Sequence, residues 1–210
     1  VSMTRIAAVV FDLGGVVCDS PLHAINRFEA AQGLEHNALN RAIANSGPTG
    51  AWSRLERGEL EPDAFVAPFT RDLKRAGFDV DGGALFAAIR GSSEPRPVML
   101  EAIARIRRSA LQVAALTNNW RDDEDDHPMQ DLFDVVIESA KTGVRKPDPK
   151  IYQLTCEALG VEFSQAAFLD DIGANLKAAR ELGMTTIKVD DPLVALRKLE
   201  ELLGFPLLDA

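Results

Sequence analysis

Five short apolar runs alternate with longer segments of helical period, and this alternation limits the fold of the 210-residue chain more than any other feature. Short apolar runs that end at polar or glycine-containing turns are typical of buried strands, and their alternation with helices is typical of a parallel sheet. We therefore predict an α/β fold, a Rossmann-like doubly wound parallel sheet. The expected strands are residues 6–11, 111–116, 133–137, 166–169 and 185–189, and the expected helices are residues 97–109, 149–159, 174–182 and 192–203.

One long stretch interrupts the alternation, because residues 19–96 show helical spacing and no convincing strand. The spacing is carried by Leu22, Ile25 and Phe28, by Trp52, Leu55 and Glu56, by Phe65, Phe69 and Leu73, and by residues 84–90. Pro62 suits the first turn of the third of these helices. We predict an all-helical segment at 19–96, hereafter the helical segment, inserted after the first strand of an α/β core formed by 1–18 and 97–210. Residues 91–97 are expected to be a linker, and the acidic run 122–126 a solvated loop.

Charge and composition narrow the classes of partner and compartment. The formal net charge of −9 argues against nucleic acid, which is bound through clustered Lys and Arg, but does not argue against a small anionic substrate. Two cysteines, Cys18 and Cys156, offer no disulfide framework and favour a reducing cytoplasm. We expect no membrane span and no signal peptide, and we leave Val1 and Ser2 out of the fold prediction. An exposed apolar surface on the helical segment would suit a homodimer, which the sequence does not decide.

Polar residues follow four of the expected strands at their carboxyl ends, where ligands bind in open α/β sheets. Each group alone also fits a structural role, such as a helix cap, a turn or a solvated loop lysine. The two adjacent aspartates are harder to explain in that way, because like charges repel and a turn needs only one of them. Together the groups predict a functional site. They are Asp12, Thr117-Asn118-Asn119, Arg145-Lys146-Pro147 and Asp170-Asp171.

These four groups resemble the four motifs of the haloacid dehalogenase superfamily, in the same order and over essentially the whole chain. Asp12 lies in VVFDLGGVV, Thr117 ends ALTNN, Lys146 lies in GVRKPDPKIY, and Asp170-Asp171 lie in FLDDIGANLKAARELGM. A narrower similarity, to the amino-terminal phosphatase domain of soluble epoxide hydrolases and its free-standing bacterial relatives, is carried by LTNNW, RKPDPKIY, FLDDIGANLKAARELGM and GPTGAWSRLERGEL. The epoxide-cleaving domain of those hydrolases has no counterpart in this sequence. The resemblance implies a phosphatase that acts on a small phosphorylated substrate.

The resemblance also implies roles for the acidic residues. Asp12 would be the nucleophile that forms an aspartyl phosphate, which water then hydrolyses. Mg²⁺ would be held by the carboxylates of Asp12 and Asp171 and by the backbone carbonyl of Gly14. Asp170 would support the site by hydrogen-bonding Lys146 or a metal-bound water, and Asn175 would help to orient the acidic loop.

Phosphate binding would fall to three other residues. Thr117, with the backbone or side chain of Asn118, would bind the phosphoryl oxygens, and Lys146 would neutralise the charge that Asp12 and the phosphate share. The helical segment would be the cap that covers the site and shapes substrate choice. Its aromatic residues Trp52 and Phe65, together with Phe69, would either line the substrate side or pack inside the cap.

Gly14 departs from the family pattern, in which the residue two after the nucleophile is usually a second Asp that serves as general acid and base. A positioned general acid commonly contributes about 10²–10⁴ in rate, so slow or selective hydrolysis is expected. Three explanations fit. In the first, the substrate has a good leaving group, as in a sugar 1-phosphate, an acyl phosphate or an aryl phosphate. In the second, the proton comes from water, from the substrate or from another residue such as Asp19 or His23. In the third, the protein binds a phosphorylated ligand without turnover.

A 2-haloacid dehalogenase is the nearest alternative enzyme, because it uses the same Asp nucleophile on carbon, lacks the second Asp and needs no magnesium. Retention of Asp170 and Asp171 counts against it, since paired carboxylates suit a metal and repel a carboxylate substrate. A phosphomutase fits less well, because that chemistry relies on the missing general acid. A binding or regulatory protein is the alternative outside the enzymes.

Overall fold

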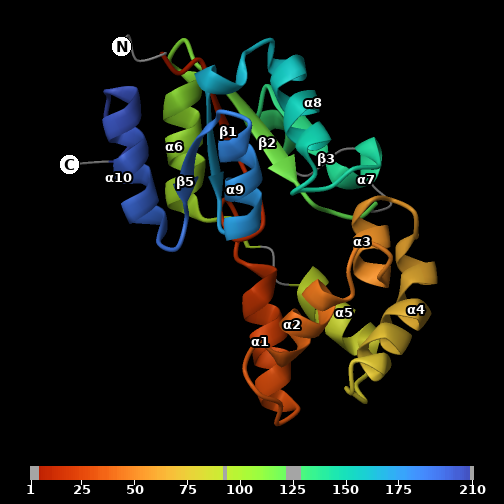
Figure 1. Cartoon of the computed structure of the whole chain (residues 1–210). Helices are drawn as coiled ribbons and strands as arrows, with labels where there is room; N and C mark the ends of the chain where they lie inside the picture. The colour runs from red at the N-terminus through yellow and green to blue at the C-terminus, as the bar shows by residue number, and fades with distance from the viewer. Residues whose placement is uncertain (1–4, 92–93, 122–128, 209–210) are drawn as a thin grey trace.

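A five-stranded parallel sheet forms the centre of the computed structural model, which describes residues 5–91, 94–121 and 129–208 (Figure 1). The strand order is β3-β2-β1-β4-β5. The first strand therefore lies in the middle, where Phe11 is paired in register with Ala115 on one side and Leu169 on the other. This is the doubly wound α/β arrangement that the sequence predicts. The strands are β1 (Ala8–Phe11), β2 (Gln112–Thr117), β3 (Val135–Glu138), β4 (Ala166–Asp170) and β5 (Thr185–Lys188).

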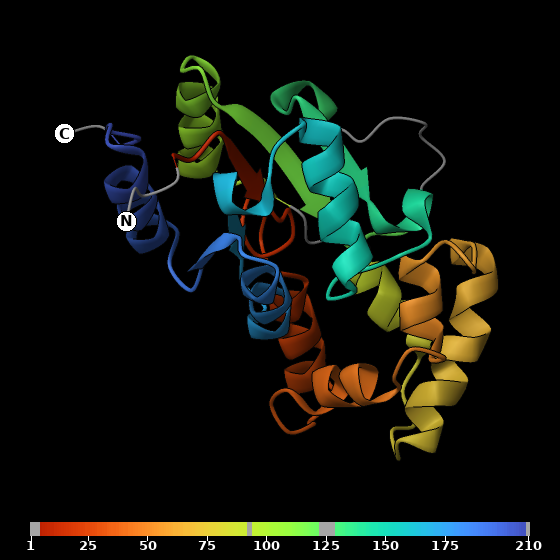
Figure 2. The same cartoon turned by 45° about the horizontal axis from the view of Figure 1, so that its top comes forward.

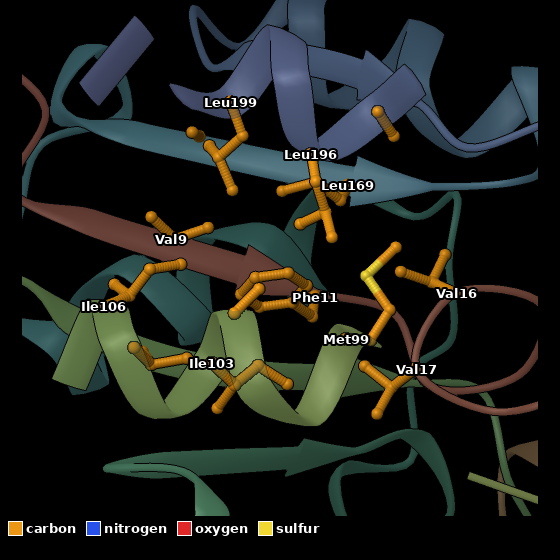
Figure 3. Close-up of a cluster of buried hydrophobic side chains, with 14 of the residues drawn as sticks. Val9, Phe11, Val16, Val17, Met99, Ile103, Ile106, Leu169, Leu196 and Leu199 are labelled. Carbon is orange, nitrogen blue, oxygen red and sulfur yellow. The ribbon is translucent and has the colours of Figure 1, made fainter. Parts of the chain in front are cut away.

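Alternate residues of each central strand face opposite layers of helices, because side chains along a strand point to opposite faces. Val9 and Phe11 face α6 (Pro97–Arg107) and α10 (Pro192–Leu203), where they pack against residues such as Ile103 and Leu196 (Figure 3). Ala8 and Val10 face the opposite layer, formed by α8 (Pro149–Leu159) and α9 (Gly173–Glu181). All four of these β1 residues are fully buried, which explains why the strand is a continuous apolar run.

Proline marks the start of many helices, since its fixed φ suits the first turn and its missing N–H would have no partner there. It stands in the first turn of α1 (Pro21–Ala31), α4 (Pro62–Arg75), α6, α8 and α10. The side chains of Ser20, Asp148 and Asp191 also accept hydrogen bonds from the first turns of α1, α8 and α10. These local signals explain why most helix starts agree with the sequence prediction to within a residue.

The helical segment packs around a hydrophobic cluster of its own and lies beyond the carboxyl ends of the strands (Figures 1 and 2). Its helices are α1, α2 (Ala38–Asn45), α3 (Ala51–Glu56), α4 and α5 (Gly82–Arg90). Phe65 and Phe69 are buried in this cluster and stack on each other with ring centroids 4.7 Å apart. Trp52 contacts both rings, so these three aromatic side chains pack inside the segment.

Two crossings of the chain connect the helical segment to the α/β core, and they lie side by side. Asp19 N donates to Glu94 O at 2.9 Å, and Arg96 N donates to Val17 O at 2.8 Å. The Arg96 guanidinium donates to the carbonyl of Gly15 at 2.8 Å and lies 3.4 Å from the Asp19 carboxylate. One arginine thus ties both crossings to the turn that follows β1.

Several details differ from the sequence prediction. The α2 helix was not expected, because the residue that caps it is distant in the sequence. The Glu29 carboxylate of α1, rather than the Asn37 side chain at the start of α2, accepts hydrogen bonds from the first backbone N–H groups of α2. The short helix α7 (Ser139–Thr142) follows β3 directly, where a loop was expected. β1 begins two residues later than predicted, and β3 is shifted to Val135–Glu138. The acidic run 122–126, residues 92–93 of the linker and Val1-Ser2 lie outside the described residues. No helix in the described part of the chain has the length and apolarity needed to cross a membrane.

Candidate active site

Asp12 directly follows β1 at the centre of the sheet edge. Its backbone N–H donates to Leu169 O at 2.9 Å, which continues the pairing with β4 by one residue. The residue is 7% exposed, and its Oδ1 accepts the Leu13 N–H at 2.8 Å. Because β1 lies between β2 and β4, Asp12 stands beside the ends of both neighbouring strands, where the other expected site residues begin.

Lys146 links three strands at this edge. Its buried Nζ lies 2.7 Å from Asp12 Oδ1 and 2.8 Å from Asp170 Oδ2, and it donates to Leu116 O at 2.9 Å. The side chain is 1% exposed, so the ammonium exchanges its hydration shell for three protein oxygens. Lys146 is therefore a buried lysine, and the alternative of a solvated loop lysine is excluded.

Asp170 ends β4 and is completely buried. Besides Lys146, its carboxylate accepts the Ile172 N–H at 2.7 Å, and both of its oxygens lie within 3.2 Å of Asn175 Nδ2. Asn175 is itself held, because its carbonyl accepts the buried Tyr152 hydroxyl at 2.9 Å. These donors fix the orientation of Asp170, and the supporting roles expected for it and for Asn175 stay predictions.

Asp171 is placed by the turn after Asp12. Gly15 adopts φ +88°, and a Cβ at this position would lie about 2.1 Å from Asp171 Oδ2, so the carboxylate approaches the chain where only glycine leaves room. Ser20 Oγ also lies 3.3 Å from the same oxygen. The turn and the start of α1 together hold Asp171 beside Asp12.

The site carries more negative than positive charge, and its pKa values reflect this. Burial raises the pKa of Asp12 to about 8; Lys146 opposes the rise, and Asp170 and Asp171 add to it. Burial and Asp170 raise the pKa of Asp171 to about 6. Burial disfavours the charged form of Lys146, but Asp12 and Asp170 outweigh burial and raise the pKa of its ammonium. One lysine therefore does not balance the three carboxylates.

Thr117 ends β2 beside Asp12 and is 5% exposed, at the position expected for a phosphate ligand. The side chain of Asn118 is already engaged: its Oδ1 accepts the Lys146 N–H at 2.8 Å, and its Nδ2 donates to Lys146 O at 3.1 Å. If Asn118 binds a phosphoryl group as expected, the backbone N–H is the mode that these two contacts leave open. The amide instead fixes the lysine loop.

Gly14 occupies a different place in the turn from Gly15. Its φ is not positive, so the backbone there does not itself require glycine. A Cβ would lie 3.3 Å from Pro21 Cδ, which is tighter than usual contact. Of the two residues named as alternative proton donors, Asp19 is paired with Arg96, and His23 is exposed on α1. No described contact brings either one to Asp12.

Sequence reasoning missed three residues at this site. Ser20 contacts Asp171, and a Ser-Pro pair before a helical pattern is a recognisable cap signal. Arg96 had no such signal, because its partners Gly15 and Val16 lie about 80 residues away along the chain. Glu56 was read only as part of a helical pattern, yet its carboxylate lies 2.6 Å from the guanidinium of Arg145, beside Lys146.

A divalent metal suits the donor set at the carboxylate cluster. Asp12, Asp170 and Asp171 each offer an oxygen, and these oxygens lie within 4.8 Å of one another. Hard cations such as Mg²⁺ prefer carboxylate, carbonyl and water oxygens, and they supply the positive charge that the cluster lacks. Among the described contacts, Asp12 uses only Oδ1, so its Oδ2 remains for a ligand. The cluster therefore fits a hard divalent cation.

Comparison with known proteins gives a consistent result. Residues 6–183 match the sequence profile of the haloacid dehalogenase-like hydrolases. The chain is 39% identical over 206 residues to mouse acyl-CoA dehydrogenase family member 10, a match that covers 95% of this chain and 19% of that protein. It is 33% identical over 218 residues to pig bifunctional epoxide hydrolase 2, covering 96% and 39%. A protein named as a phosphatase from Mycobacterium tuberculosis is 32% identical, with 88% of both chains covered. The chain thus spans well under two thirds of the first two relatives.

Solved structures agree on the fold. A predicted haloacid dehalogenase-like hydrolase from Porphyromonas gingivalis superposes with a TM-score of 0.67 at 22% identity, covering 93% of this chain and 98% of that one. An enzyme of the same family from Bacteroides thetaiotaomicron, solved with magnesium and inorganic phosphate, gives 0.60 at 20% identity, covering 87% and 93%. L-2-haloacid dehalogenase from Xanthobacter autotrophicus also gives 0.60, at 22% identity, covering 98% and 85%.

Proposed function

The chain belongs to the haloacid dehalogenase-like hydrolase family, and we propose that it is a magnesium-dependent phosphatase of a small phosphorylated metabolite. The observation that carries this proposal is the cluster of Asp12, Asp170 and Asp171 around one buried lysine. A carboxylate nucleophile, a fixed cation and a metal-binding set of oxygens are what phosphoryl transfer requires. The relative from Mycobacterium tuberculosis that is named as a phosphatase supports the same reaction class.

Magnesium would be held by Asp12, Asp171 and the backbone carbonyl of Gly14. The chain contributes two acidic side chains at a sheet edge whose negative charge exceeds its positive charge, and the turn at Gly15 keeps Asp171 close. When bound, magnesium supplies positive charge that orients the phosphoryl group and offsets its negative charge. The magnesium in the Bacteroides thetaiotaomicron enzyme is consistent with this assignment, which depends on the donor set described above.

Asp12 would act as the nucleophile. A carboxylate oxygen of Asp12 forms a bond to phosphorus while the bond to the leaving-group oxygen breaks, and the leaving oxygen takes up a proton from water. Water then attacks phosphorus, breaks the aspartyl–phosphate bond and releases inorganic phosphate. Lys146 favours the ionised form of Asp12 against the effect of burial, and it orients the carboxylate through the 2.7 Å contact at Oδ1.

Binding of the phosphoryl oxygens would fall to Thr117, the backbone of Asn118 and Lys146. Asp170 and Asn175 keep Lys146 in place and do not reach the substrate themselves. Such groups act by position and by electrostatics, since they are already oriented before the charge develops. The helical segment would act as a cap that covers this edge of the sheet.

Gly14 leaves the leaving group without the usual proton donor. Asp19 is held by Arg96, so we favour a substrate whose leaving group needs little protonation, such as a sugar 1-phosphate, an acyl phosphate or an aryl phosphate. With such a substrate, loss of a positioned acid matters less than the roughly 10²–10⁴-fold that it commonly contributes. The prediction is selectivity by leaving group, with alkyl phosphates hydrolysed slowest.

The test is release of inorganic phosphate from sugar 1-phosphates, acyl, aryl and alkyl phosphates, with magnesium and with a chelator. Asp12→Asn removes the nucleophile, Gly14→Asp restores the family's acid at a site where Pro21 must shift slightly, and Asp79→Asn removes a charge whose side chain is 95% exposed. Magnesium-dependent release that is lost only in Asp12→Asn, and that extends to alkyl phosphates in Gly14→Asp, supports the proposal.

Two other outcomes would replace the proposal. Halide release from 2-haloacids without magnesium would make the chain a dehalogenase, although three clustered carboxylates disfavour a carboxylate substrate. Binding of magnesium and a phosphate analogue with no release, together with release by Gly14→Asp, would make it a ligand-binding relative.

A further inference from the structure

The helical segment contacts the α/β core at the two loops that carry expected phosphate ligands. Trp120 closely follows Thr117 and reaches into the segment's aromatic cluster, with its ring centroid 5.3 Å from Phe86 and 6.3 Å from Trp52. Arg145 immediately precedes Lys146 and reaches α3, where its Nη1 donates to Ser53 Oγ at 3.0 Å. Both contacts connect site loops to helices of the segment.

Besides the contacts of the Lys146 ammonium, three described interactions anchor the loop of Lys146. The Asn118 amide holds the Lys146 backbone, and the Asp148 N–H donates to Arg145 O at 2.9 Å, which closes a tight turn around Lys146. These two anchors lie within the α/β core. The third is the side chain of Arg145, and it alone among them depends on where the helical segment lies.

The third anchor is an ion pair between a buried carboxylate and a partly exposed guanidinium. Glu56 ends α3, is 7% exposed, and places Oε2 2.6 Å from Arg145 Nε. The geometry of these two atoms does not satisfy the angles of a hydrogen bond, so the interaction is an ion pair without a hydrogen bond. Burial raises the pKa of Glu56, while Arg145 and a hydrogen bond from Trp52 lower it. Removing Arg145 would leave the Glu56 carboxylate buried without its partner, and removing Glu56 would leave a half-buried guanidinium without its carboxylate.

The chain next to Glu56 fits closely against the core. Gly58 has φ +66°, and a Cβ there would lie about 2.4 Å from the carbonyl oxygen of Ala140 in α7. The end of α3 is thus in backbone contact with the element that leads into the lysine loop. A shift of α3 relative to the core would therefore act on Arg145 directly.

We propose that Arg145, held by Glu56 and Ser53 of the helical segment, is a positioning residue that holds Lys146 in its catalytic place only while the segment is docked. Arg145 touches none of the reacting atoms and acts through the backbone of Lys146. Docking of the segment and completion of the site are then one event. The effect on catalysis rests on the proposed phosphatase function, whereas the effect on the loop does not.

A second ion pair between the segment and the core provides a matched control. Glu61 Oε1 lies 3.3 Å from Arg121 Nη1, and both side chains are more than half exposed. Exposed ion pairs contribute little to stability, because water and salt screen the two charges. Glu56→Gln and Glu61→Gln therefore make the same change at two segment–core contacts, of which only the first reaches the lysine loop.

The first experiment measures hydrogen–deuterium exchange of residues 143–150 in the full chain. Glu56→Gln and Arg145→Met should speed exchange of the Lys146 and Asp148 amides, while Glu61→Gln should leave it unchanged. This readout holds whether or not the chain hydrolyses phosphates. Equal exchange in all variants would overturn the proposal. If a single variant fails to fold, Glu56→Gln combined with Arg145→Met removes the unpaired charge and allows the same measurement.

The second experiment measures kcat and KM on the best phosphate ester. Glu56→Gln and Arg145→Met should lower kcat by about tenfold to a hundredfold, with a smaller change in KM, because small displacements of catalytic groups have effects of that size. The double variant should be no worse than either single one, and Arg145→Lys, which can still pair with Glu56, should recover part of kcat. Additive losses, or losses equal to that of Glu61→Gln, would overturn the proposal. If the wild type releases no phosphate but Glu56→Gln and Arg145→Met still speed loop exchange, the phosphatase is refuted and the coupling stands.

Discussion

Replacing the nucleophile should stabilise the metal-free protein, and the gain should grow with pH. Asp12 is 7% exposed beside two other carboxylates, and its pKa rises from 3.8 to about 8 on folding, chiefly through burial. Between those values the folded protein holds a proton that the unfolded chain has released. Raising the pH through this window therefore lowers the free energy of unfolding of the wild type. Asn at this position does not titrate.

The size of the effect follows from the pKa difference. One unit corresponds to about 1.4 kcal/mol, so the three units between pH 5 and pH 8 give at most about 4 kcal/mol. We therefore expect about 2–4 kcal/mol for Asp12→Asn relative to wild type at pH 8, and much less at pH 5. Active sites commonly carry such destabilising groups.

The assay is urea unfolding at several pH values with a chelator present, and then with magnesium. Asp79→Asn removes the same charge from an exposed position and reports the effect of net charge alone. Magnesium should favour the wild type over Asp12→Asn, by about 2.7 kcal/mol at a hundred times its dissociation constant. A stability difference that is flat, or that shrinks as pH rises, would show that burial does not destabilise the Asp12 carboxylate.

Three other predictions concern close contacts. Gly15→Ala should weaken magnesium binding by about 10- to 100-fold, measured by calorimetry, because its Cβ would displace Asp171; unchanged affinity would remove Asp171 from the site. Glu29→Gln should lower the free energy of unfolding by about 1.5–3 kcal/mol in urea, because the carboxylate caps α2; a loss below 0.5 kcal/mol would contradict this. Gly58→Ala should shift tryptophan emission to the red, because the added Cβ would move α3 from α7 and disturb the packing of Trp52 of α3 against Trp120. Gly33→Ala is the control, since Gly33 has the same φ of +66° but an open Cβ position. Equal spectra for the two variants would argue against tight docking of α3 on α7.

Sequence reasoning located the sheet and most helices because their signals are local. Apolar runs such as Val9 and Val10 indicate a buried strand wherever they occur, and proline in a first turn indicates a helix start. The α2 helix was missed because its cap comes from Glu29, on another helix. Contacts of that kind leave no periodic trace in the sequence.

The same division holds at the candidate site. The order of strands and polar turns in the sequence was enough to bring Asp12, Lys146 and Asp170 together, since the carboxyl ends of parallel strands share one edge. Only the tertiary structure showed that the amide of Asn118 is used on the lysine loop, that Gly15 rather than Gly14 has the positive φ, and that the aromatic rings of the helical segment pack inward.

The sequence by itself determined which residue types lie at the sheet edge and in what order, because strand and turn signals act over a few residues. The tertiary structure decided how the helical segment meets that edge. The ion pair of Glu56 with Arg145 joins residues 89 positions apart in the sequence. The strength of this pair depends on how far packing of the chain shields the two charges from water. Burial and long-range charge pairing arise only when the chain is packed, and for that reason they were beyond the reach of the sequence pattern.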